Sequence, residues 1–203
     1  MQPDPAARPE FLEAFEEIVR RIARTLADTP STALPVRMYV AGGAALHLHT
    51  GTRVSEDVDG VFSRRIALPA DLEVAYRDSD GTARLLYFDR QYNDTFGLLH
   101  EDAYVESVAV SLHGIDPGVL DVRLLCALDL AVSKIARLSD QDREDIATLA
   151  ERGLVDPDRL RARATEAAQA YVGDVARLRS SIHIAVRIAR EATPKRPAPK
   201  RKR

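Results

Sequence analysis

The spacing of apolar residues changes character after residue 123 of this 203-residue chain. Near the start, apolar side chains recur at helical spacing from Glu10, which predicts an amphipathic helix that ends near Asp28, before Pro30. Short β-rich runs separated by turn residues then continue up to Arg123. Beyond that residue the apolar period lengthens from two residues to about 3.6, which indicates that the chain is helical up to about Ala192.

The β-rich runs predict six strands. Asp78 to Gly81 is a typical hairpin turn between two of them, because Asp-Gly supplies the positive φ that such turns require. A Gly-Gly pair after the first run predicts a tight turn into a short helix. The six runs are Val36–Ala41, Asp57–Phe62, Leu72–Arg77, Thr82–Asp89, Val105–Leu112 and Val119–Val122.

The C-terminal half carries clear helix signals. A helix is predicted over Leu125–Leu138 from its apolar stripe. Ser139 is a typical N-cap residue, and Asp142 three positions later closes an approximate capping box. Asp156 is a second N-cap, with Pro157 in the favoured first helical position.

These elements predict an α+β protein with a small mixed sheet flanked by helices and a helical C-terminal half. We expect an α/β domain over residues 1–123 and a helical domain over residues 124–192. A basic, disordered tail is expected over residues 193–203, which are rich in Lys, Arg and Pro.

Composition narrows the class of protein only slightly. The chain has 45% hydrophobic and 30% charged residues, an ordinary balance for a soluble globular protein. No apolar run approaches the roughly 20 residues that span a bilayer, so no membrane association is expected. Cys126 is the single cysteine, which fits a reducing compartment and predicts a cytoplasmic protein. The formal net charge of -2 conceals the basic tail, so the charge of the whole chain excludes no class of partner.

The candidate chemistry lies between the first two predicted strands. Strand residues two apart project to the same side, so Asp57 and Asp59 direct two carboxylates at one point. Crowded carboxylates repel each other, and a hard divalent cation such as Mg²⁺ relieves the repulsion. Upstream, Gly42 and Gly43 allow the backbone to approach a phosphate, which the N-terminus of the following helix also attracts. The combination predicts a site for a metal-bound triphosphate.

Each of these signals has a simpler interpretation when it stands alone. Asp-x-Asp is common at exposed strand ends, and Gly-Gly marks many turns; the order strand, glycines, helix, Asp-x-Asp strand is what favours a functional site. His47 and His49 point about 200° apart on a helix, so we expect them to be surface or partly buried histidines that do not share a metal. Cys126 is expected to be a small core residue.

Four separated blocks resemble a known family. The glycine and aspartate motifs resemble the minimal nucleotidyltransferases of the DNA polymerase β superfamily, and within it the AbiEii and MenT toxin group. The resemblance covers roughly residues 38–150. The blocks are Gly42-Gly43-Ala44-Ala45-Leu46, Arg53-Val54-Ser55-Glu56-Asp57-Val58-Asp59, Asp129-Leu130-Ala131-Val132-Ser133-Lys134 and Asp142-Arg143-Glu144-Asp145.

The resemblance implies a role for each motif residue. It implies that Asp57 and Asp59 bind the metal, and that the nucleotide contacts Gly42, Gly43, Ser55 and Lys134. The catalytic residues that it implies are Asp57, Asp59, Lys134 and Asp145. Lys134 could otherwise snorkel at a domain edge, and the resemblance favours phosphate binding. Asp145 could otherwise form a surface ion pair, and the resemblance implies that it orders Lys134 or the nucleotide.

A third metal-binding carboxylate is usual in this superfamily, on a strand beside the Asp-x-Asp strand. The chain has no clean motif for it. Asp89, at the end of a predicted strand, is the best candidate, with Glu73 and Asp102 as rivals.

The resemblance implies an enzyme that uses an NTP as substrate and Mg²⁺ or Mn²⁺ as cofactor. It would transfer a nucleotidyl group to an RNA acceptor, tRNA above all, or to a protein. It further implies the toxin of a toxin–antitoxin or phage-defence system, with an antitoxin protein as partner. The alternative is a nucleotidyltransferase fold that has lost catalysis and serves as a binding or regulatory module.

Overall fold

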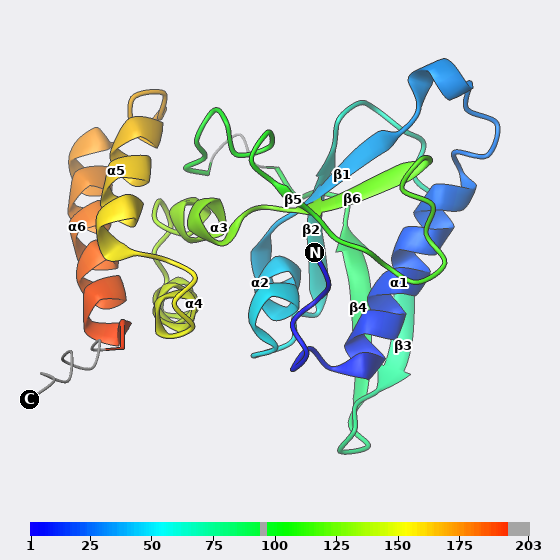
Figure 1. Ribbon diagram of the computed structural model, residues 1–203, viewed down its shortest axis with the longest axis horizontal. Coiled ribbons are helices and arrows are strands. Elements are labelled where there is room, and N and C mark those ends of the chain that lie inside the picture. Colours follow the sequence, from blue (N-terminus) through cyan, green and yellow to red (C-terminus); the bar gives the residue numbers. More distant parts are fainter. Residues whose placement is uncertain (94–96, 195–203) are drawn as a thin grey trace, which may run out of the picture.

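A computed structural model of the chain describes residues 1–93 and 97–194, so most of the predicted basic tail lies outside the described residues. The protein has a sheet-containing half and a helical half, which lie side by side along the long axis of the molecule (Figure 1). The polypeptide passes from one to the other directly after the last strand. The division into separate domains at residues 123 and 124 stays a prediction.

A six-stranded mixed sheet forms the first half, in the order β3-β4-β2-β1-β6-β5. Strand β1 pairs antiparallel with β2 and parallel with β6, while β4 pairs parallel with β2 and antiparallel with β3. The short β5 closes the far edge against β6. The strands are β1 Val36–Val40, β2 Asp57–Phe62, β3 Glu73–Arg77, β4 Ala83–Asp89, β5 Val108–Ala109 and β6 Leu120–Leu124.

Two helices pack on the sheet. Helix α1 (Pro9–Arg24) lies along β3 and β4 (Figure 1) and buries an apolar stripe that includes Phe11, Phe15 and Ile18. Helix α2 (Gly42–Thr50) follows β1 directly and packs against β2. A 3-10 turn, Ser31–Ala33, lies between α1 and β1.

Four helices form the second half. Helix α3 (Ala127–Ser133) and helix α4 (Asp140–Glu151) lie next to the sheet, and α5 (Pro157–Ala167) and α6 (Val175–Ala192) lie beyond them (Figure 1). Helix α6 packs on both α4 and α5. Ser139 and Asp142 form the predicted capping box of α4. The predicted N-caps therefore divide this half of the chain correctly.

Two predicted elements are shorter than the sequence indicates. The run Val105–Leu112 contributes only the two residues of β5, because Ser107 holds the chain in a turn instead. The Ser107 hydroxyl donates to the carbonyl of Tyr104, and the guanidinium of Arg123 donates to both the hydroxyl and the carbonyl of Ser107.

The helix predicted over Leu125–Leu138 ends at Ser133. After Ser133 the backbone tightens, because the N–H groups of Lys134 and Ile135 donate to carbonyls three residues back, and Leu138 then reverses the chain with a φ of 49°. This reversal brings the chain to Ser139, where α4 begins. The turn that follows Ser133 contains Lys134 and Arg137, and its position matters for the site described below.

Among the described residues, no helix is both long enough and apolar enough to cross a membrane.

Candidate active site

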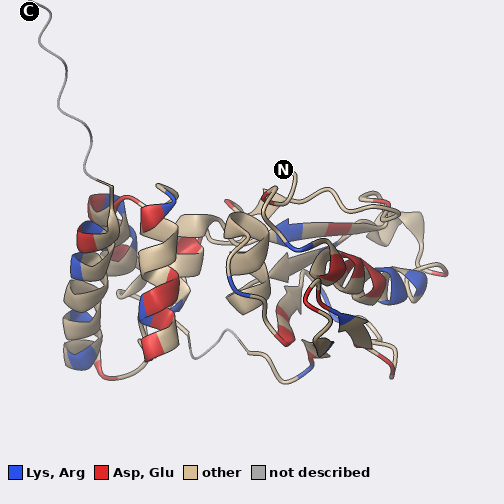
Figure 2. Ribbon diagram, turned by 90° about the horizontal axis from the view of Figure 1, so that it is seen from below, with Lys and Arg blue, Asp and Glu red and all other residues tan. Residues whose placement is uncertain are grey.

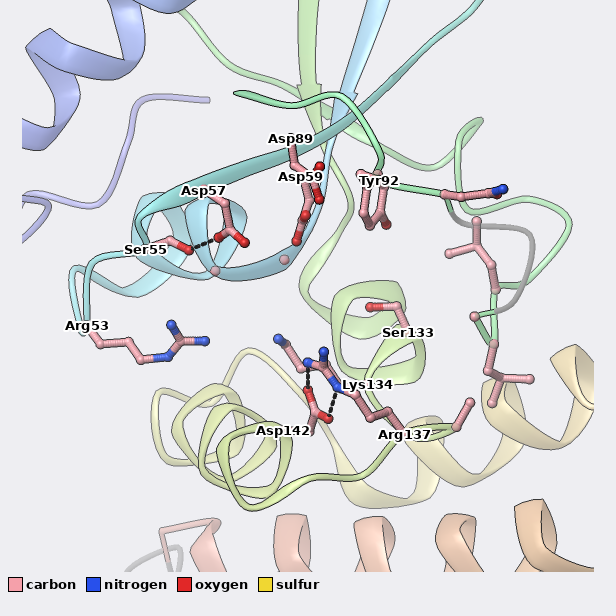
Figure 3. Close-up of a pocket in the computed structure, with 17 residues that line it drawn as sticks. Arg53, Ser55, Asp57, Asp59, Asp89, Tyr92, Ser133, Lys134, Arg137 and Asp142 are labelled. Carbon is pink, nitrogen blue, oxygen red and sulfur yellow. Dashed lines mark hydrogen bonds and ion pairs between the residues drawn. The ribbon is translucent and has the colours of Figure 1, made fainter. Parts of the chain in front are cut away.

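Three carboxylates meet where β2 and β4 run side by side. Asp57 and Asp59 lie two residues apart on β2, with the intervening Val58 fully buried in the core. Strands β2 and β4 are parallel, and their register places Asp89 directly beside Asp59. Figure 3 shows the three side chains directed into one cavity. The strand geometry thus selects Asp89 as the third carboxylate of this group.

The position of Asp59 is electrostatically unfavourable for an ionised carboxylate. Burial, followed by the charges of Asp57 and Asp89, raises the pKa of Asp59 to about 6. Lys134 and Arg137 act in the opposite direction, but their effect is smaller. A divalent cation between the carboxylates would offset both the burial and the mutual repulsion. The chemistry of this donor set therefore fits a hard metal ion.

The two glycines at the start of α2 make room for this arrangement. Gly42 has a φ of 60°, and a Cβ built there would lie 1.8 Å from Oδ2 of Asp59. A Cβ on Gly43 would lie 2.5 Å from Oγ of Ser55. The helix start has no side-chain cap, since Ala41 is the N-cap residue. Its first backbone N–H groups can therefore bind an anion.

Gly42→Ala is expected to reduce metal binding by more than its cost in stability would explain. The left-handed conformation costs an alanine about 1 to 2 kcal/mol. In addition, the new methyl group would displace the carboxylate of Asp59 from the cavity. Gly153→Ala is the matched control, since Gly153 has a φ of 69° and open space around it. Equal Mg²⁺ titration curves for the two variants would show that the close contact with Asp59 is unimportant.

Ser55 supports the carboxylate of Asp57. Its side chain is almost fully buried, and its hydroxyl donates a hydrogen bond to Oδ1 of Asp57. The bond fixes the direction of one oxygen of Asp57. Ser55, which is predicted to contact the nucleotide, lines the cavity, and its hydroxyl is bonded to this carboxylate.

Positively charged side chains form the opposite wall of the cavity. Lys134 follows α3 and is only 6% exposed, and its Nζ lies 2.6 Å from Oδ2 of Asp145. Arg53, from the loop after α2, binds both oxygens of Asp145, at 2.9 and 2.8 Å. Asp145 itself lies on α4 with a side-chain exposure of 2%. One buried carboxylate therefore orders both cations.

Arg137 is the third cation of this wall, and a buried aspartate holds it in place as well. Its guanidinium donates two hydrogen bonds of 2.7 Å to the two oxygens of Asp142. Asp142 is fully buried and also accepts hydrogen bonds from the backbone and hydroxyl of Ser139, so the capping box of α4 holds the arginine. The side chain of Arg137 is 76% exposed apart from this anchor. Figure 3 shows Arg53, Lys134 and Arg137 across the cavity from the carboxylates.

The two anchoring aspartates are ionised for a clear physical reason. Burial by itself would raise the pKa of Asp145, but hydrogen bonds and charge from Arg53 and Lys134 outweigh it, and the net pKa is lowered. The pKa of Asp142 is lowered in the same way, since Arg137 and Ser139 outweigh the burial. These pairs therefore persist at neutral pH.

The cations retain hydrogen-bonding capacity toward the cavity. A guanidinium has five N–H groups, and Arg53 and Arg137 each use two of them on their aspartates. The ammonium group of Lys134 has three N–H groups, and Asp145 takes one. A ligand with several anionic oxygens could accept the remaining donors, as a polyphosphate does.

The cavity between the two walls has a volume of about 570 Å³, within the usual range for sites that bind small ligands. The predicted site residues Gly42, Gly43, Ser55, Asp57, Asp59, Asp89 and Lys134 all line it. Arg53, Arg137 and Asp142 line it as well, together with Tyr92, Leu98 and Ala136. Asp145 does not line the cavity and acts from behind Arg53 and Lys134.

The other candidates for the third carboxylate lie elsewhere. Glu73 is on β3, one strand further from β2 than Asp89, and Asp102 is exposed beside His100. Neither lines the cavity. Of the two histidines of α2, His49 is partly buried as expected, whereas His47 is fully buried. His47 bonds to the backbone of Arg8 and Thr52, and His49 bonds to the carbonyl of Leu125.

Cys126 is half-buried and does not serve as a plain core residue. It is the N-cap of α3, where its sulfur accepts from the backbone N–H of Asp129 and lies 3.3 Å from Oδ2 of the same residue. Glu106, Cys126 and Asp129 lie close enough together to hold a metal ion. However, Arg163 already donates to both carboxylates, with two bonds of 2.8 Å to Asp129. We interpret this group as an ion-pair connection between α3 and α5.

Sequence reasoning did not assign Arg53 and Arg137 to the site. Arg53 belongs to the Arg-x-Ser-x-Asp motif itself, so its position in the motif was a usable signal. Arg137 lies three residues after Lys134, a spacing that places two side chains on one side of a helical turn. Their anchoring by Asp145 and Asp142 depends on the packing of α4, which the sequence does not reveal.

A mixed sheet with a glycine pair after its first strand and Asp-x-Asp on the next, extended by a helical half, is the nucleotidyltransferase fold. A family model agrees with this class. The model of the family described as nucleotidyltransferase of unknown function, DUF6036, matches residues 15–187, and the chain therefore belongs to this family. No match was found among curated proteins, and none was found among solved structures.

Proposed function

We propose that the protein transfers a nucleotidyl group from an NTP to a hydroxyl acceptor in a metal-dependent reaction. The observation that carries the proposal is the opposition of two walls across one cavity. Asp57, Asp59 and Asp89 line one side, and Arg53 and Lys134 line the other. A metal-bound triphosphate is a ligand that uses both, since carboxylates hold its metal ion and cations bind its phosphate oxygens.

The three carboxylates would hold the divalent cation, Mg²⁺ or Mn²⁺. Such an ion, when bound, neutralises phosphate charge and activates an attacking oxygen. The fit rests on the crowded, partly buried position of Asp59 and on the oxygen-only donor set. The hydrogen bond from Ser55 occupies one oxygen of Asp57 and orients the carboxylate, so the other oxygen is available to the metal ion.

The remaining residues would bind and orient the triphosphate. Lys134 and Arg53 are held in place by Asp145, and their unused donors would bind phosphate oxygens. The N-terminus of α2, beginning at Gly42, would bind a further phosphate. Because these groups are ordered before the substrate arrives, the reacting phosphate would be positioned without a large entropic cost.

We further propose that the acceptor is an RNA, with tRNA favoured over a protein by the resemblance to the AbiEii and MenT group. The same resemblance supports a cytoplasmic toxin that is paired with an antitoxin protein. These statements rest on the four motif blocks and the order in which they occur. A small reading frame for an antitoxin beside the gene would be the simplest support for the toxin role.

The proposed activity can be tested by incubating the purified protein with each labelled NTP, Mg²⁺ and total RNA, followed by separation of RNA from protein on a gel. We expect label on RNA from at least one NTP. Label on protein instead would identify a protein acceptor. No transfer from any NTP, together with no NTP binding in calorimetry, would favour the alternative of a module that has lost catalysis.

Lys134→Ala is expected to weaken the apparent affinity for the NTP more than it lowers turnover. The ammonium group acts through charge on the phosphates, so its loss should appear mainly as a raised KM. Arg143→Ala is the control, because it removes one positive charge from α4 at a side chain that is 48% exposed and does not line the cavity. A larger effect on kcat than on KM would show that Lys134 acts in the chemical step.

A further inference from the structure

Helix α6 presents a line of basic side chains to solvent. Arg179, His183 and Arg187 are exposed and follow one another at intervals of four residues, so they lie on one side of the helix. Successive members are about 6 Å apart along the helix axis. We call these three residues the α6 basic stripe. Figure 2 shows Lys and Arg positions along this helix, which leads to the C-terminus.

The charges of the stripe are not neutralised by neighbouring carboxylates. Within residues 1–93 and 97–194, neither Arg179 nor Arg187 forms an ion pair, whereas Arg190 pairs with Asp158 of α5 at 2.7 Å. Glu191 is the single acidic residue of α6, at its C-terminal end. Exposed arginines without an ion pair among the described residues are available to an external anion.

The stripe also contrasts with the rest of the molecule. Residues 175–203 contain ten Lys and Arg and one Glu. The first 174 residues contain nineteen Lys and Arg and thirty Asp and Glu, which gives them a net charge of -11. By sequence, residues 193–203 continue the same charge with six Lys and Arg and no acidic residue. Positive charge is therefore concentrated at one end of an otherwise acidic protein.

The apolar side of α6 is not available to a membrane or to a second hydrophobic partner. Leu178, Ile182 and Val186 are buried against the helices that α6 contacts, α4 and α5. A helix that binds a lipid surface by insertion needs an exposed apolar face beside its basic one. The stripe thus offers charge and hydrogen-bond donors without apolar area, which suits a nucleic-acid backbone.

We propose that the α6 basic stripe binds the phosphate backbone of the acceptor RNA at a distance from the reacting end. This proposal rests on the proposed function in its choice of RNA. Arginine suits this role, since its planar guanidinium binds phosphate oxygens in pairs, and all four cationic residues of α6 other than histidine are arginines. Contacts to phosphates position a nucleic acid without reading its bases, so this contact is independent of sequence.

Helix α6, which carries the stripe, lies at the end of the helical half that is away from the sheet (Figure 1). Helix α6 packs on α4, and α4 supplies Asp142 and Asp145, which anchor the cationic wall of the cavity. An RNA that reached both places would have to extend across the helical half. A folded RNA with a stem fits this requirement better than a mononucleotide or a short single strand.

The test is RNA binding by the full chain in the inactive background Asp59→Asn, with neither NTP nor Mg²⁺ present. The probe is a fluorescently labelled RNA stem-loop with a single-stranded 3′ end, followed by anisotropy over a range of salt concentrations. Arg179→Gln with Arg187→Gln is expected to weaken binding roughly tenfold near 0.1 M salt. The plot of log K against log salt has a negative slope, and the double substitution should make that slope shallower by about 2.

The matched control is Arg64→Gln with Arg65→Gln, two exposed arginines that follow the end of β2 remote from Asp57. These two substitutions remove the same amount of charge, and they should leave the affinity for RNA and the salt slope unchanged. An unchanged affinity in the Arg179 and Arg187 variant would overturn the proposal. So would an equal loss in the control, which would show that only total charge matters.

A third arm uses vesicles that contain phosphatidylglycerol. Loss of vesicle binding in the Arg179 and Arg187 variant, with RNA binding intact, would assign the stripe to a lipid surface and overturn the proposal. Since no arm contains NTP, these outcomes are separate from those of the nucleotidyl-transfer assay. Failure of transfer with intact, stripe-dependent RNA binding would remove the proposed enzyme and leave the RNA contact.

Discussion

Asp59→Asn is expected to abolish nucleotidyl transfer while the fold remains intact. Asp59 lies between the other two carboxylates, beside Asp57 on its own strand and Asp89 on the next. Loss of one ligand removes several kcal/mol of stabilisation of the charge that develops on the phosphates, which corresponds to a rate reduction of about a thousandfold. The measurement is the rate of label transfer from the preferred NTP at saturating Mg²⁺.

The same substitution should stabilise the metal-free protein at neutral pH. The pKa of Asp59 is raised from 3.8 to about 6 in the folded state, so the protonated carboxyl is favoured there. The contribution of the Asp59 carboxyl to the stability of the folded state is fully present below pH 3.8 and is lost as the pH rises through 6. Asparagine does not titrate, so the variant should exceed the wild type by about 1 to 3 kcal/mol at pH 7 and equal it near pH 3.5.

Chemical unfolding in EDTA at several pH values would measure this difference. Glu56→Gln is the control, because Glu56 is exposed, precedes Asp57 and does not line the cavity. It should change neither transfer nor the pH dependence of stability. Full transfer activity in Asp59→Asn would remove Asp59 from the site. If Asp59→Asn were less stable than the wild type at pH 7, the claim that burial and the neighbouring carboxylates destabilise the ionised Asp59 would be contradicted.

Asp145→Ala is expected to destabilise the protein by about 3 to 5 kcal/mol, the usual cost of breaking a buried ion pair from one side. Asp145 is 2% exposed and is the anchor of both Lys134 and Arg53. Without it the buried ammonium group of Lys134 has lost its carboxylate, and Arg53 is no longer fixed. The free energy of unfolding from urea titration gives the first effect, and the KM for the NTP should rise as well.

Asp158→Ala is the matched control for this substitution. Asp158 also pairs with an arginine, Arg190, but its side chain is 80% exposed, so its loss should cost less than about 1 kcal/mol. Asp145→Asn separates charge from packing, since the amide keeps the shape and one acceptor. Equal stability losses in Asp145→Ala and Asp158→Ala would show that the buried network contributes no more than a surface pair.

Much of the fold follows from local patterns. Strand β2 begins and ends where alternation predicts, and the capping box of Ser139 and Asp142 fixes the start of α4. Two segments differ from the prediction. Arg123 holds the chain before β5 in a turn, and a tight turn that ends at the left-handed Leu138 replaces the last predicted helical residues after Ser133. Neither feature leaves a periodic signal in the sequence.

Local spacing also predicts some of the residues that line the cavity, but not all of them. Asp57 and Asp59 share a strand, so their convergence follows from a period of two residues. Asp89 is thirty residues further on, and only the parallel register of β2 and β4 brings it beside Asp59. Glu73 and Asp102 could not be excluded without that register. The anchoring of Arg53 by Asp145 joins residues 92 positions apart, which is beyond the reach of motif spacing.

Isothermal titration calorimetry of NTP binding, with and without Mg²⁺, tests the central claim most directly. The cavity between the carboxylates and the cationic wall should bind at least one NTP, and that binding should require Mg²⁺ or Mn²⁺. It should be lost in Asp59→Asn and retained in Glu56→Gln. The absence of NTP binding by the wild type with either metal, or equal binding by Asp59→Asn, would contradict the assignment of this cavity as a metal-dependent nucleotide site.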